Sequence, residues 1–236
     1  MTSLPEIKNR ARPLSAFINR FLKWVKNNRY TFNFIAILLF LVLLPLVDEN
    51  SVTQFVVSIL IIVLLFFSVH AISANRIHLA IGICFVICLI FLNFLYYLTQ
   101  TLHYHQTSIL VALFFFGFVA IVIFSGIIRG QETTRDTIFG AISVYFLIGI
   151  TWAFGIMTLE NLSPHSFSIG GIGSDPISSL SDYVGYSFSV LTTTGNYQVA
   201  ALTSTARMVM MFEMITGTLF IAVLISWLVG KLLIKN

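Results

Sequence analysis

Six long apolar segments recur along this chain, and they constrain its fold more than any other feature. About 20 consecutive apolar residues are enough for a helix to cross a bilayer. The predicted spans are Phe32–Val47, Val52–Val69, Ile77–Leu98, Ile109–Ile128, Thr137–Leu159 and Thr205–Ile234. Only 9% of the residues are charged, whereas a typical soluble domain carries about 25%. The sequence therefore predicts an all-α integral membrane protein with six transmembrane helices.

The basic residues predict how these spans are oriented. With six spans, every Lys and Arg except Arg207 falls on the same side of the membrane. The residues on that side are Lys8, Arg10, Arg12, Arg20, Lys23, Lys26, Arg29, Arg76, Arg129, Arg135, Lys231 and Lys235. Because short loops rich in Lys and Arg stay in the cytoplasm, both termini are expected there. We expect a multi-pass protein of the plasma membrane, or of the inner membrane if the source is bacterial.

Residues 1–30 form a basic segment whose apolar side chains share one helical face over "LSAFINRFLKWVKNNRY". Such a helix lies in the membrane interface, held by apolar burial and by anionic lipid. Anionic lipid is therefore an expected partner of this cytoplasmic segment, and nucleic acid is not. A calmodulin-like partner that binds the same helix is the alternative.

A shorter apolar segment, Ile177–Leu191, lies between the fifth and sixth spans. It is too short and too rich in serine to cross the bilayer, but it has the size of a re-entrant helix. The preceding link, residues 160–179, is rich in Gly, Ser and Pro, and it predicts an external turret with little regular structure. Ser179 and Asp182 have the spacing of a capping box that would start the helix. Its C-terminal end would bring partial negative charge into the membrane, which favours a cation there.

The run "YSFSVLTTTG" and the following "TSTARMVMMFEMITGTLFIAVLISWLVG" resemble the potassium-channel superfamily of tetrameric pore-loop cation channels, with a pore like that of the two-span bacterial members. The similarity covers roughly residues 138–232, and the spacing from Gly195 to Arg207 and to Gly217 follows the pore of that family without a gap. The resemblance implies a homotetramer, because one filter strand per chain cannot surround an ion and four can. It also implies a pore domain over residues 130–236, made of a span, the turret, a pore helix, the filter and an inner helix.

The same resemblance implies roles for individual residues. Thr193, through its hydroxyl and carbonyl oxygens, and the carbonyl groups of Thr194 and Gly195 would bind a monovalent cation, K⁺ or Na⁺. Gly217 would be the hinge of the gate. The remaining filter and supporting positions are Asn196 and Tyr197 in the filter, and Thr192, Ser189, Gln198 and Glu213 around it.

The outer half of this filter departs from the family pattern T-V-G-Y-G-D, which falls on residues 193–198. Tyr197 stands where the family uses glycine in a left-handed conformation, which costs another residue about 1–2 kcal/mol per chain. Gln198 replaces the acid at the mouth, and Ser189 is neutral, so an acid pair that braces the filter is absent. We expect about two well-formed ion sites, and K⁺ permeation with weak discrimination against Na⁺. The alternatives are a rebuilt, fully selective outer filter and a non-conducting one.

Residues 31–129 would form a four-helix peripheral domain in the place of a voltage sensor. An arginine-rich fourth span senses voltage at about 2.3 kcal/mol per charge per 100 mV. The span Ile109–Ile128 contains no Arg or Lys, and Arg129 follows only at its end. A conventional voltage sensor is therefore not expected.

Glu213 is the only acid within a predicted span, so it should face the protein interior. One interpretation is a hydrogen bond to the pore helix through Ser187 or Ser189, and the other is a ring of acids that concentrates cations.

Two other function classes compete with a channel. A related ion transporter would need four pore repeats, whereas this chain has one. An intramembrane hydrolase could use the serine of "GYSF", but no histidine lies in a later span to activate it. We therefore expect a protein that is not an enzyme and has no cofactor, only permeating K⁺ or Na⁺.

Overall fold

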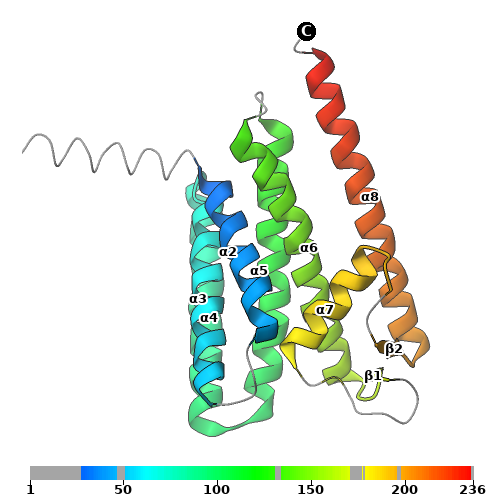
Figure 1. Cartoon of the computed structure of the whole chain (residues 1–236). Coiled ribbons are helices and arrows are strands. Elements are labelled where there is room, and N and C mark those ends of the chain that lie inside the picture. The colour runs from blue at the N-terminus through cyan, green and yellow to red at the C-terminus, as the bar shows by residue number, and fades with distance from the viewer. Residues whose placement is uncertain are drawn as a thin grey trace, which may run out of the picture.

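The computed structural model describes residues 28–46, 51–130, 134–170, 177, 179–195 and 198–234, and these are mostly helical (Figure 1). Residues 1–27 of the predicted N-terminal segment, residues 48 and 49, Asp175, Asn196, Tyr197 and Lys235 lie outside the described residues. The long helices are α2 (Arg29–Leu43), α3 (Ser51–Ala71), α4 (Arg76–Thr99), α5 (Leu102–Arg129), α6 (Arg135–Leu162) and α8 (Ser204–Ile234). The short elements are the 3₁₀ turn η1 (Leu44–Leu46), strand β1 (Phe167–Ile169), helix α7 (Leu180–Leu191) and strand β2 (Val199–Ala201).

Within the described part of the chain, four helices are long and apolar enough to cross a membrane, as expected of a helical membrane protein. They are α4, α5, α6 and the part of α8 that runs from Ser204 to Trp227. The helix α2 and the segment Ile59–Ala71 of α3 are shorter apolar helices. Each predicted span thus overlaps a helix, and among the described residues four of these helices are long and apolar enough to cross a membrane. The spans predicted over Phe32–Val47 and Val52–Val69 stay predictions.

Two local differences separate the observed elements from the predicted ones. The helix α5 begins at Leu102, before the predicted start at Ile109, because the polar residues of "LHYHQTS" continue the helix instead of forming a loop. Strand β1 lies in the link where we expected little regular structure, and it pairs with β2 in an antiparallel sheet. This small sheet is an addition to the predicted all-α fold.

The helices α2 to α6 pack side by side as a bundle (Figure 1). Its centre is filled by fully buried apolar side chains: Phe40, Phe115, Ile123, Leu147, Ile150 and Ile156. At one end of the bundle Asp136, in the first turn of α6, accepts hydrogen bonds from the Thr31 backbone N–H and hydroxyl, both at 2.8 Å. Because the first N–H groups of a helix lack partners within it, this carboxylate caps α2 from a neighbouring helix.

The helix α7 lies between α6 and α8 and runs obliquely to both (Figure 1). Beyond this contact α8 leans away from the bundle (Figure 1). Many of its apolar side chains are exposed, among them Met211, Phe212, Ile215, Leu219, Val223 and Ile225. An exposed apolar face in a membrane protein is covered by lipid or by another protein surface.

Candidate functional site

The N-terminal end of α7 has the predicted cap. The Ser179 hydroxyl accepts from the Asp182 backbone N–H at 3.0 Å and donates to the Asp182 carboxylate at 2.7 Å. This pair satisfies one of the donor groups that a helix start leaves open. The helix begins at Leu180, three residues after the predicted start at Ile177.

Glu213 and Ser187 join α8, α7 and α6 in one buried hydrogen-bonded group. The Ser187 hydroxyl lies 2.5 Å from Glu213 Oε1 and 2.7 Å from the Gly149 carbonyl oxygen. Both Ser187 and Glu213 are 0% exposed. Of the two predicted partners of Glu213, the structure therefore brings Ser187 into contact. Ser189 instead donates to the Tyr186 carbonyl oxygen.

Counting protons identifies the form of Glu213 that fits this geometry. A serine hydroxyl carries a single proton, so it cannot donate to both Gly149 and Glu213. Both contacts are hydrogen bonds if Ser187 donates to the Gly149 carbonyl group and a neutral Glu213 donates to Ser187. A neutral acid also avoids the cost of an unpaired charge at this depth. The geometry therefore favours a bracing role over a ring of charged acids.

Two glycines allow α7 to approach its neighbours closely. The Phe188 ring lies on Gly149 of α6, where a Cβ would be 2.7 Å from the ring. The Leu191 carbonyl oxygen lies against Gly217 of α8, where a Cβ would be 2.2 Å from that oxygen. The Tyr145 hydroxyl donates to the same oxygen at 3.5 Å. Gly217 is predicted to be a hinge. Independently of that role, the position has no room for a side chain, because the end of α7 packs directly on it.

The chain leaves α7 in a tight turn over Thr192–Gly195. The Thr193 N–H donates to the Val190 carbonyl group at 2.9 Å, and the Thr194 N–H donates to that of Ser189 at 3.0 Å. These two bonds form a Schellman motif, in which the residue after the helix cap is left-handed. That residue is Thr193, with φ of +57°, a conformation that costs a residue other than glycine about 1–2 kcal/mol. Gly195 has φ of +60°, and no atom lies within 4 Å of the position of its Cβ.

This turn directs consecutive carbonyl groups away from α7. The N–H groups of Thr193, Thr194 and Gly195 all point back to carbonyl oxygens of the helix, and none of the peptide bonds between described residues is cis. In a trans peptide the C=O and the following N–H point in opposite directions. The carbonyl oxygens of Thr192, Thr193 and Thr194 therefore point away from the helix end, on a part of the chain that is exposed.

The threonine hydroxyls of the turn differ in their contacts. Thr192 Oγ1 donates to the Phe188 carbonyl oxygen at 2.6 Å and lies 3.1 Å from Thr194 Oγ1. Thr194 Oγ1 donates to the Ser189 carbonyl oxygen at 3.3 Å. Among the hydrogen bonds within the described part of the chain, none involves the Thr193 hydroxyl. The structure thus brings Thr192, Thr193, Thr194, Gly195 and Ser189 together.

Of the predicted filter positions after Gly195, only Gln198 is among the described residues. Asn196 and Tyr197 are outside the described residues, so their predicted roles stay predictions. Gln198 is exposed, and its backbone carbonyl group accepts from the Gly170 N–H at 2.7 Å. Sequence reasoning did not identify Gly149 or Tyr145, although a glycine within an otherwise bulky apolar span is a signal for close helix packing.

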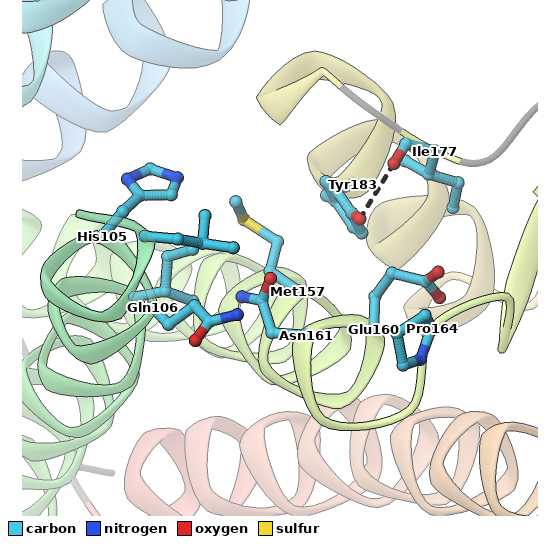
Figure 2. Close-up of a pocket in the computed structure, with 10 residues that line it drawn as sticks. His105, Gln106, Met157, Glu160, Asn161, Pro164, Ile177 and Tyr183 are labelled. Atoms are coloured by element: carbon cyan, nitrogen blue, oxygen red, sulfur yellow. Dashed lines mark hydrogen bonds between the residues drawn. The ribbon is translucent and has the colours of Figure 1, made fainter. Parts of the chain in front are cut away.

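A separate cavity of about 360 Å³ lies where α5, α6 and the start of α7 meet (Figure 2). Figure 2 shows the amides of Gln106 and Asn161 near each other, with Met157 beside them and Tyr183 across the gap. Burial raises the pKa of Tyr183 to about 12, and the charges of Glu160 and Asp182 add to that effect. Tyr183 is therefore a neutral phenol that donates to the Ile177 carbonyl oxygen at 3.1 Å. The cavity does not include the threonine turn.

The contact at Gly217 predicts the effect of adding one methyl group. We expect Gly217→Ala to destabilise the folded protein by about 1–3 kcal/mol, because the Leu191 carbonyl oxygen must move and carry the end of α7 with it. Thermal unfolding in detergent measures this. Gly230→Ala, in the same helix, is the control, because nothing lies within 4 Å of its Cβ position. Equal unfolding temperatures for the two variants would contradict the packing role.

The proton count at Glu213 predicts a second pair of variants. We expect Glu213→Gln to keep the unfolding temperature within a few degrees, because the amide can donate to Ser187 as a neutral acid does. Glu213→Leu should destabilise by about 1–3 kcal/mol, because Ser187 loses a buried partner. A Gln variant as unstable as the Leu variant would show that the negative charge is required.

The chain matches no protein-family model, no curated protein and no solved structure. The resemblance of residues 138–232 to tetrameric pore-loop channels therefore stays an expectation from the sequence. The structure adds to it the seating of α7 between α6 and α8, and an exposed turn whose carbonyl groups point away from the helix.

Proposed function

We propose that this chain is the pore-forming subunit of a tetrameric, potassium-channel-like cation channel. The observation that carries the proposal is the turn Thr192–Gly195, which presents three consecutive carbonyl groups away from α7 on an exposed part of the chain. Carbonyl oxygens in a row can replace the water around a dehydrated cation. One chain offers one such row, and four copies around an axis enclose an ion.

The proposed ion sites use the carbonyl groups of Thr193 and Thr194, which are two of the three that point away from α7, together with that of Gly195, which the resemblance implies. The Thr193 hydroxyl is the one threonine hydroxyl of the turn without a hydrogen bond among the described residues, so it can serve as a further ligand. Selectivity depends on the number or the fit of such ligands. With Tyr197 and Gln198 in place of glycine and acid, we propose K⁺ permeation with weakened discrimination against Na⁺.

The proposed topology has six spans with both termini in the cytoplasm of a plasma membrane, or of an inner membrane in a bacterium. The helix α3 has 21 residues, which is long enough to cross. The helix α2 has 15 residues and continues directly into η1, and a short span is accommodated by local thinning of the bilayer. Arg76, Arg129 and Arg135 lie at helix ends that are on the cytoplasmic side in this topology. This placement agrees with the positive-inside rule.

The proposed peripheral domain, α2 to α5, does not act as a conventional voltage sensor. Arg129 is the last residue of α5, and the apolar part of that helix carries no basic side chain. A charge at the end of a span crosses little of the membrane field. Opening of the proposed pore therefore depends on the filter, on lipid, on tension or on a partner.

Reconstituted protein tests the proposal through bi-ionic reversal potentials for K⁺ and Na⁺. We expect cation current with a K⁺/Na⁺ permeability ratio well below one hundred, and a clear fall in conductance for Thr193→Val, which removes the hydroxyl at constant shape. Thr158→Val is the matched control, because the Thr158 hydroxyl donates to the Phe154 carbonyl group within α6.

The outcomes of this experiment separate the alternatives. A ratio above one hundred would mean that the outer filter is rebuilt. Absence of current, with intact tetramers, would mean a non-conducting filter, and absence of tetramers would contradict the channel itself. If selectivity is weak, Asn196→Tyr, Tyr197→Gly and Gln198→Asp together should raise it. If the triple variant leaves selectivity unchanged, residues 193–198 are not the ones that match the family filter.

A further inference from the structure

Two short chain segments meet beside the end of α6 and the start of α8 (Figure 1). They are Ser166–Gly170 and Gln198–Leu202, here called the β clip. Its strands β1 and β2 are antiparallel, with Ser168 opposite Ala200. Hydrogen bonds close both ends, from the Gly170 N–H to the Gln198 carbonyl group at 2.7 Å and from the Leu202 N–H to that of Ser166 at 2.8 Å. The clip therefore joins the turret to the chain directly after the predicted filter.

Glu160, in the last turn of α6, attaches the clip to that helix. One carboxylate oxygen accepts from the His165 N–H at 2.6 Å, and the other accepts from the Phe167 N–H at 3.0 Å. The chain between Glu160 and Phe167 turns tightly, and His165 within it has a φ of +65°. Hydrogen bonds to an ionised acceptor are stronger than those between neutral groups. A single side chain thus sets the position at which β1 begins.

The Phe167 side chain attaches the same strand to α7. It is 0% exposed, and its ring lies 5.8 Å from the Tyr186 ring in an edge-to-face arrangement. Such aromatic pairs add to the stability that burial itself provides. The strand is therefore held by α6 through its backbone and by α7 through its side chain.

The loop between α7 and the clip is short, so its two ends constrain each other. The Ser189 carbonyl group holds Gly195 at the helix end, and the clip holds Gln198. Only two residues lie between Gly195 and Gln198, and a residue extends the chain by at most about 3.6 Å. A shift of the clip therefore moves Gln198, which only two residues separate from Gly195.

We propose that Glu160 is a positioning residue of the proposed pore: through the β clip it fixes the outer end of the filter, in place of an acid pair at positions 189 and 198. This inference rests on the proposed function for its effect on ion flow. The attachment of the clip to α6 stands on the contacts of Glu160 alone. No contact of Glu160 with the permeating ion is implied.

Glu160→Gln tests the proposal in the full-length protein. Glutamine places an amide NH₂, which only donates, at the position of one carboxylate oxygen. One of the N–H groups of His165 and Phe167 therefore faces a donor instead of an acceptor. We expect amide hydrogen exchange in β1 and β2 to become at least about tenfold faster, as loss of a hydrogen bond to a charged group implies. In reconstituted protein the K⁺/Na⁺ permeability ratio should change by about threefold or more, the size of effect that a partial loss of ligand positioning allows.

A disulfide across the clip tests whether the position of the clip controls permeability. If it does, the disulfide should restore the permeability that Glu160→Gln alters. Hydrogen bonds join Gly170 to Gln198 and Leu202 to Ser166, so Ile169 and Val199 are by alternation a non-hydrogen-bonded pair, with Cα atoms about 4.5 Å apart. Such a separation suits a disulfide. We expect oxidised Ile169→Cys/Val199→Cys to return the permeability of Glu160→Gln to the wild-type value, and reduction to abolish the rescue. The native Cys84 and Cys88 are replaced by Ala in this background.

Asn161→Gln, at the next position of α6, is the control and should leave exchange and permeability unchanged. Wild-type exchange in Glu160→Gln would overturn the inference, and so would faster exchange with unaltered permeability. If the wild-type protein passes no cations, the proposed function fails. The exchange rates then still decide whether Glu160 holds the clip.

Discussion

The seating of α7 between α6 and α8 is the constraint on which the rest of the proposed pore domain depends. At Gly217 the backbone of α8 lies against the Leu191 carbonyl oxygen, at a distance that leaves no room for a Cβ. A short helix contributes little stability by itself, and most of its order comes from tertiary packing. Gly149 lets the Phe188 ring of α7 lie on the backbone of α6, and Gly217 lets the backbone of α7 lie on that of α8. This packing determines where the threonine turn lies.

A short helix inside a membrane protein also needs partners for its terminal backbone groups, since lipid offers none. Ser179 and Asp182 meet this need at the start of α7. At its end the turn folds back, and the N–H groups of Thr193, Thr194 and Gly195 occupy the last helical carbonyl groups. The same folding back directs the following carbonyl groups outward. Satisfying the helix end and presenting oxygen ligands are therefore two results of one backbone conformation, maintained against the cost of a left-handed Thr193.

Much of this organisation could be predicted from the sequence, because it follows from hydrophobic periodicity and local capping. The apolar segments coincide with helices, and the spacing of Ser179 and Asp182 predicted the cap of α7. Glu213 was expected to face inward because a lone acid in an apolar helix must, and the structure places it on Ser187.

Other features depend on contacts between distant segments, which local patterns do not encode. Nothing in the local sequence pairs residues 167–169 with 199–201 or places Glu160 under two backbone N–H groups. The fit of Leu191 on Gly217 likewise appears only once α7 and α8 are in place. The left-handed Thr193 contradicts local propensity, since a β-branched residue rarely adopts positive φ. A departure of this kind is tolerated when surrounding contacts determine the conformation, and it is common at functional sites.

The central claim is that the threonine turns of four chains surround a cation. An experimental structure of the assembled protein in Tl⁺, a heavy substitute for K⁺ with strong anomalous scattering, tests this most directly. The account predicts anomalous density on a four-fold axis, within coordination distance of the oxygens of Thr193 and Thr194. Turns that face lipid or do not meet at an axis, or an axis without ion density beside these threonines, would contradict it.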